Sequence, residues 1–73
     1  MEENKQKICD LLSKALIETR GGSNISGIRY INDTEKNMEF AVVMFMGGGS
    51  RHINVTCDSG VAMIRDIMKN LGV

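Results

Sequence analysis

A run of three glycines, at residues 47–49, lies between two segments that have the composition of β-strands. The segment before it, residues 38–46, is rich in aromatic and β-branched side chains. The segment after it, residues 51–57, alternates Ile53 and Val55 with polar residues. Three successive glycines give the backbone the freedom that a tight reversal needs. The pattern therefore predicts a β-hairpin, and the rest of the chain must cover it.

The facing of this hairpin depends on the number of residues in its loop. A loop of two or four residues would place the even-numbered residues of the first arm on the same face as Ile53, Val55 and Cys57. We expect this face to be the core side, so that Cys57 is a buried cysteine. The core-facing side chains of the first arm are then Met38, Phe40, Val42, Met44 and Met46. The opposite, outer row is expected to be Glu39, Ala41, Val43 and Phe45 beside His52, Asn54 and Thr56.

Two amphipathic helices are expected to flank the strands. The first spans about residues 3–20, where apolar residues recur at the spacing of one helical face. Gly21 and Gly22 are expected to end it through a left-handed C-cap. The second spans about residues 59–71, after the N-cap candidates at residues 58–60.

A further strand is expected over residues 25–32, where β-branched and aromatic residues favour extended structure. Its register depends on the loop that follows. With a loop of five residues, the register that we prefer, Ile28 and Tyr30 face inward and lie opposite Val42 and Phe40. With a loop of six residues, the inward row is instead Ile25, Arg29 and Ile31.

These elements predict one small α+β domain over residues 1–73, with the order α-β-β-β-α. Short connections place consecutive strands beside one another, which gives a three-stranded antiparallel meander. Both helices can bury their apolar stripes only if they lie on one face of the sheet. The other face of the sheet is then left uncovered.

Nine basic and nine acidic residues give a formal net charge of zero, so no overall field attracts nucleic acid or an anionic membrane. The start of the chain lacks the pattern of a signal peptide, and no segment has the length of a membrane span. We therefore expect a cytoplasmic protein. Cys9 and Cys57 are expected to be free thiols, and with His52 they lack the paired spacing of a zinc site. No metal, cofactor or small-molecule substrate is expected.

The partly apolar outer row favours a non-enzymatic interaction module that contacts a protein or a second copy of itself through the open sheet face. The expected contact residues are Ala41, Val43, Phe45, His52 and Asn54. The substitution Phe45→Asp is then expected to weaken association and to leave the fold intact. A thiol enzyme is the least favoured reading, because His52 and Cys57 would point to opposite faces, about 17 Å apart along one strand.

The predicted element order resembles that of the double-stranded-RNA-binding domain, over most of the chain and without a shared motif. In that family a lysine cluster at the start of the second helix grips phosphates, whereas residues 58–60 here are Asp-Ser-Gly. The loop between the first two strands carries Asp33 and Glu35. Acidic groups at both contact points oppose phosphate binding. The resemblance in element order nevertheless makes weak nucleic-acid binding the alternative function.

Overall fold

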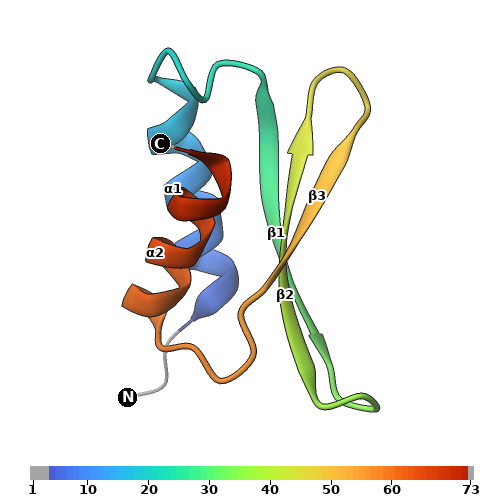
Figure 1. Ribbon diagram of the computed structural model, residues 1–73. Helices are drawn as coiled ribbons and strands as arrows, with labels where there is room; N and C mark the ends of the chain where they lie inside the picture. Colours follow the sequence, from blue (N-terminus) through green and yellow to red (C-terminus); the bar gives the residue numbers. More distant parts are fainter. Residues whose placement is uncertain (1–3, 73) are drawn as a thin grey trace.

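The computed structural model describes residues 4–72. Along the chain, these residues form a helix, three strands and a second helix (Figure 1), which confirms the predicted order. The predicted start of the first helix, at residue 3, lies outside the described residues. None of the described helices has the length and apolar character needed to cross a membrane. The elements are α1 (Lys5–Ile17), β1 (Ile25–Asp33), β2 (Met38–Phe45), β3 (Ser50–Asn54) and α2 (Gly60–Leu71).

The molecule has two layers, and both helices lie on one face of the sheet (Figure 1). The sheet is antiparallel, with β2 in the centre and β1 and β3 at the edges. Helix α1 packs against β1 and α2, and α2 also contacts β3. The core lies between the layers and consists of Cys9, Leu16, Ile25, Ile28, Ala41, Val43, Ile53, Val55, Met63 and Ile67.

The loop between β2 and β3 contains an odd number of residues. The N–H of Phe45 donates to the carbonyl of Gly49 at 2.9 Å, and the N–H of Gly48 donates to the carbonyl of Phe45 at 3.0 Å. Gly49, which directly precedes β3, thus lies opposite Phe45, and the loop between this last pair consists of residues 46–48. Gly48 has φ 96°, the left-handed conformation that follows a type I turn in hairpin loops of three residues. The predicted loop of even length is wrong.

This odd loop turns each side chain of β2 to the face opposite to the predicted one, because a shift of one residue inverts a strand. Ala41 and Val43 are fully buried beneath the helices, and Phe45 packs against the same core. Ala41 lies directly opposite Ile53, which faces inward as predicted. The outer row of β2 is instead Met38, Phe40, Val42 and Met44.

The turn between β1 and β2 has four residues and ends at Asn37, whose φ of 58° is left-handed. Ile28 therefore lies opposite Val43, and Tyr30 lies opposite Ala41. Both β1 side chains face the core side, as the preferred register predicted, but each pairs with a partner one residue further along. Neither the five-residue nor the six-residue loop is present.

A β-bulge in β1 explains a second departure from simple alternation. The register shifts between Ile25 and Gly27, so Ser26 is the extra residue of β1. As a result Ile25 and Ile28, three residues apart, are both buried. The bulge therefore adds one more apolar side chain to the core beneath α1.

The two helices end in different ways. Helix α2 ends at Gly72, with φ 73°, and begins after Ser59, whose Oγ accepts a hydrogen bond from the Ala62 N–H at 3.2 Å. Both ends agree with the prediction. Helix α1 ends at Ile17 with a right-handed C-cap, Glu18. The predicted left-handed cap at residues 21–22 is wrong, because neither glycine has a positive φ.

Candidate functional site

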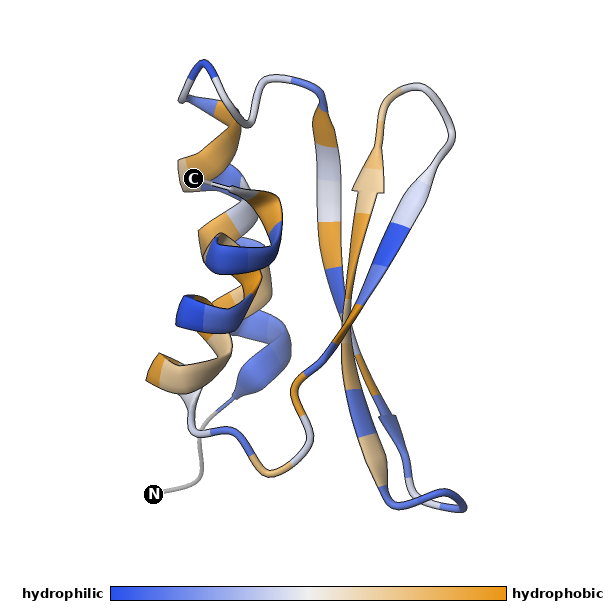
Figure 2. Ribbon diagram, in the orientation of Figure 1, coloured by the Kyte–Doolittle hydropathy of each residue, from blue (hydrophilic) through white to orange (hydrophobic). Residues whose placement is uncertain are grey.

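The face of the sheet that points away from the helices is uncovered (Figure 1). The register of the strands places apolar side chains of β2 along its centre. Figure 2 shows that almost the whole length of β2 is hydrophobic. Because successive side chains of a strand point to opposite faces, both faces of the sheet have apolar side chains here. Phe40 and Met44 are half-buried. Val42, between them, is only 7% exposed, although no helix covers it. We call this uncovered surface of the sheet the open face.

Polar and charged side chains flank this apolar row on both neighbouring strands. Arg29 of β1 and His52 of β3 lie opposite Val42 on its two sides, which accounts for the low exposure of Val42. The His52 ring meets the Phe40 ring edge to face, with centroids 6.4 Å apart and an interplanar angle of 73°. Ile31, opposite Phe40, is 39% exposed and extends the apolar row onto β1.

The predicted contact residues do not lie together. His52 and Asn54 are exposed on the open face, as expected from the clear alternation in β3. Ala41, Val43 and Phe45 point to the opposite face and belong to the core or pack against it, so none of them can form an outer contact surface. The odd loop is the physical reason. The feature of the sequence that could have indicated it is the third glycine, which a loop of three residues with a left-handed position can use.

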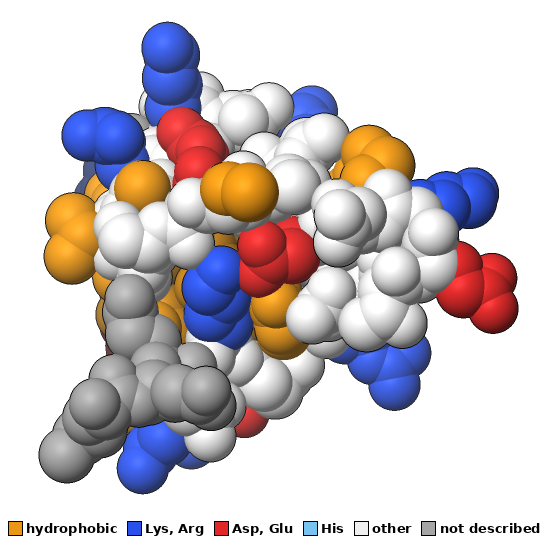
Figure 3. Space-filling model, turned by 90° about the horizontal axis from the view of Figure 1, so that it is seen from below, with side chains coloured by type: hydrophobic (Ala, Val, Ile, Leu, Met, Phe, Trp, Pro, Cys, Tyr) orange, Lys and Arg blue, Asp and Glu red, His pale blue; other side chains and the backbone are white. Residues whose placement is uncertain are grey.

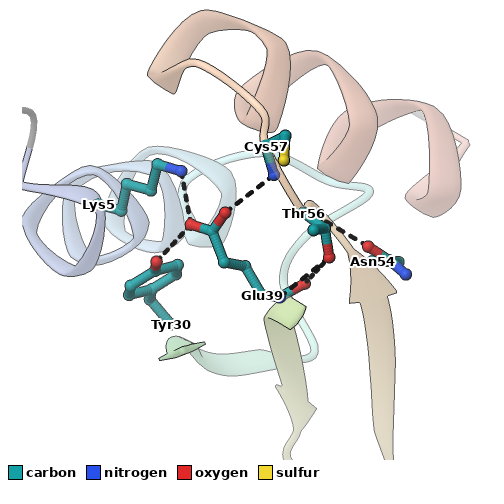
Figure 4. A network of polar contacts seen from close by, with 6 residues as sticks. All are labelled: Lys5, Tyr30, Glu39, Asn54, Thr56 and Cys57. Atoms are coloured by element: carbon teal, nitrogen blue, oxygen red, sulfur yellow. Dashed lines mark hydrogen bonds and ion pairs between the residues drawn. The ribbon is translucent and has the colours of Figure 1, made fainter. Parts of the chain in front are cut away.

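A polar cluster lies at the end of the helix-facing row of β2, centred on Glu39 (Figure 4). Its Oε1 is 2.6 Å from Lys5 Nζ and accepts a hydrogen bond from the Tyr30 hydroxyl. Its Oε2 accepts from the Cys57 N–H at 2.9 Å. The Glu39 and Lys5 side chains are each 17% exposed. The cluster joins α1, β1, β2 and the segment before α2, and the sequence-based prediction placed Glu39 on the wrong face.

The Glu39 carboxylate is strongly stabilised in its charged form. Hydrogen bonds from Lys5, Tyr30 and the Cys57 backbone, in that order of effect, lower the pKa of Glu39 to about 2. Burial, followed by the hydrogen bond to Glu39, raises the pKa of Tyr30 to about 12. Around neutral pH the carboxylate is ionised and the phenol remains a donor. A carboxylate with so low a pKa is a poor general base, so the cluster suits a structural role.

The backbone of Glu39 is also tied to the connection between β3 and α2. The Glu39 N–H donates to Thr56 Oγ1 at 3.0 Å, and the Glu39 carbonyl accepts from the Val55 N–H at 2.9 Å. The Thr56 N–H donates to Asn54 Oδ1 at 2.9 Å. Cys57 then adopts φ 63°, which is left-handed. These contacts fix the path of the chain into α2.

We expect Glu39→Gln to make stability less dependent on pH. Because the folded pKa lies below the unfolded value of 4.5, the carboxylate contributes stability above the unfolded pKa and loses it as the pH falls toward 2. At pH 7 the variant should be less stable by about 2 kcal/mol. Urea denaturation between pH 7 and pH 2.5 measures this. The variant should lose less stability than the wild type over that range, and Glu35→Gln, in the exposed turn, should follow the wild type. Parallel curves for all three proteins would contradict the assignment.

The cysteines differ from expectation in one respect. Cys57 is exposed rather than buried, and Cys9 is the cysteine of the core. Burial, followed by the charge of Asp10, raises the pKa of Cys9 to about 11, which makes this thiol a poor nucleophile. Within residues 4–72, no three His, Cys, Asp or Glu side chains lie close enough together to hold a metal ion.

A groove of about 580 Å³ runs between α1 and the edge strand β1. Helix α1 contributes Gln6, Asp10 and Lys14 to it, and β1 contributes Ser26 and Arg29. This groove lies beside the open face. Arg29 and Met44 line both surfaces, whereas the α1 residues belong to the groove alone. The sequence did not indicate the groove, since it depends on how α1 lies along β1.

The end of the molecule at which the resemblance to the double-stranded-RNA-binding domain would place phosphate contacts has mixed charge. The start of α1, the β1–β2 turn and the start of α2 all lie at this end (Figure 1). Figure 3, which looks onto it, shows acidic side chains among the basic ones. Asp58 precedes α2, and a hydrogen bond with Asp66, together with burial, raises the pKa of its carboxyl. Two carboxyl groups in contact disfavour a phosphate at this position.

The fold and these surfaces define a small α+β domain with one open sheet face and one polar groove. Comparisons with models of protein families, with curated proteins and with solved structures found no match to the chain.

Proposed function

We propose that this chain is a cytoplasmic, non-enzymatic interaction module that binds a protein through its open face, with a second copy of the chain as the partner to test first. The observation that carries the proposal is the apolar row of Phe40, Val42 and Met44 at the centre of a sheet face that no helix covers. Arg29 and His52 flank that row on the two sides of Val42. An apolar centre with a polar rim is the usual anatomy of a protein interface.

The small size of the domain supports a second copy as partner. A chain of this length buries only about 60% of the surface that its unfolded form exposes, so its own core is small. Association that covers the open face would add apolar burial, at roughly 25 cal/mol per Å². The two free thiols fit a reducing compartment.

We expect Phe40→Glu to weaken self-association while the protein stays folded. Phe40 is half-buried on the open face, so a carboxylate there reaches water in the monomer and is desolvated only in a dimer. Sedimentation equilibrium over a concentration series measures the effect. The wild type should show a concentration-dependent dimer. The variant should need a protein concentration at least about tenfold higher to form the same fraction of dimer.

Leu11→Glu is the matched control, because Leu11 is 57% exposed on α1, on the side of the molecule away from the open face. It should dimerise like the wild type. A wild type that remains monomeric at every concentration would exclude the second copy as partner. A short RNA duplex added at low salt tests the nucleic-acid alternative in the same samples. The mixed charge at the end of the molecule predicts no complex with it.

A further inference from the structure

The free edge of β1 is partly occupied by a side chain that takes the place of a strand. The Tyr30 N–H donates to Gln6 Oε1 at 2.9 Å, and Gln6 Nε2 donates to the Ile28 carbonyl at 3.5 Å. One amide group therefore accepts from one residue of β1 and donates to the residue two positions before it. The peptide groups of a neighbouring strand make the same kind of contact.

These bonds show which backbone groups of β1 point away from β2. In a strand, the N–H and the carbonyl of one residue point to the same side. The Ile28 carbonyl points to Gln6, so the Ile28 N–H also points off the edge of the sheet. Gln6 engages only the carbonyl. The N–H of Ile28 therefore remains on the edge where an added strand would lie.

The groove between α1 and β1 begins at Gln6 and continues along this edge toward Ser26. Asp10, Ser13 and Lys14 of α1 line one side of it, and residues 26–29 of β1 line the other. Gly27 has no side chain that could narrow the groove on the β1 side. A Cβ at this position would have only the Met44 side chain within 4 Å, at 3.5 Å. A groove with a helix on one side and a strand edge on the other fits an extended peptide.

The charges of the groove favour an acidic peptide. Lys14 and Arg29 line it together with a single carboxylate, Asp10. That carboxylate already accepts a hydrogen bond from Gln6 Nε2 at 2.9 Å. Among the described residues the one ion pair joins Lys5 and Glu39, so neither cation of the groove is neutralised by a salt bridge.

We propose that the groove binds an extended, acidic peptide segment of a partner protein, which lies along the edge of β1 beside the part that Gln6 already occupies. The Ile28 N–H donates to the main chain of the peptide, and Lys14 and Arg29 bind its carboxylates. This inference goes beyond the proposed function, because it concerns the edge of the sheet and the α1 side of the groove. Phe40→Glu, which disrupts the open face, should leave peptide binding unchanged.

The test uses a displayed library of random linear peptides selected against the wild-type protein. We expect the enriched peptides to be acidic and to alternate charged with apolar residues, as a strand does. Lys14→Glu should weaken the binding of an enriched peptide at least about tenfold. Lys36→Glu, the same charge change in the exposed β1–β2 turn, should leave it unchanged.

Amide hydrogen exchange locates the bound peptide. The peptide should protect the Ile28 N–H, and in Gln6→Ala it should also protect the Tyr30 N–H, which that variant releases. Failure to enrich any peptide would overturn the proposal. So would protection confined to Val42 and its neighbours on the open face, or an equal loss of affinity in Lys14→Glu and Lys36→Glu.

Discussion

Val43→Asp is expected to prevent folding. Val43 is 0% exposed and belongs to the core beneath the helices. A carboxylate at this position would be buried without a partner, which costs about 4 kcal/mol or more. Losing the buried valine side chain costs about 2 kcal/mol more. The sum exceeds the stability of roughly 5 kcal/mol that a domain of this size has, so the unfolded state should dominate. Circular dichroism at 25 °C and thermal melting measure the effect.

The control for this prediction is the next residue along the strand. Met44→Asp makes a carboxylate on the outer row, where the Met44 side chain is half-buried and water can reach the new charge. It should cost about 1 kcal/mol and keep a cooperative melting transition. If the two variants exchanged these outcomes, the even-numbered row would face the core and the facing of β2 in the structure would be wrong.

Gly22→Ala is expected to destabilise the fold by about 3 kcal/mol, because it overpacks a site that cannot relax. A Cβ on Gly22 would lie 2.2 Å from the carbonyl oxygen of Leu16 and 2.7 Å from its carbonyl carbon. Both partners are backbone atoms at the end of α1. The Gly22 carbonyl also accepts from the Ile25 N–H at 3.0 Å, which fixes the segment to the start of β1. The midpoint of urea denaturation measures the loss.

Gly47→Ala serves as the matched substitution. A Cβ at Gly47 would have no atom within 4 Å, and Gly47 does not have a positive φ. Its effect should stay within about 0.5 kcal/mol of the wild type. An equal loss in both variants would mean that the contact with the Leu16 carbonyl does not determine the effect.

The residues that the sequence placed correctly are those with a clear local pattern. The apolar period of the helices, the Ser59 cap and the final Gly72 indicated where α2 begins and ends. In β3 and the residue after it, polar residues alternate with Ile53 and Val55, so His52 and Asn54 were assigned to the outer face as the structure has them. These signals depend on neighbouring residues alone.

The facing of β2 was decided by the tertiary structure. Its residues 40–45 are all apolar, so either row could form a core, and the sequence carries no alternation that distinguishes them. A loop of three residues, with Gly48 in a left-handed conformation, selects the row of Ala41 and Val43. The same choice places Glu39 beside Lys5, which is 34 residues away in the chain. The sequence thus determined the elements and their order, whereas contacts between distant residues determined which side of the central strand is buried and which is left for a partner.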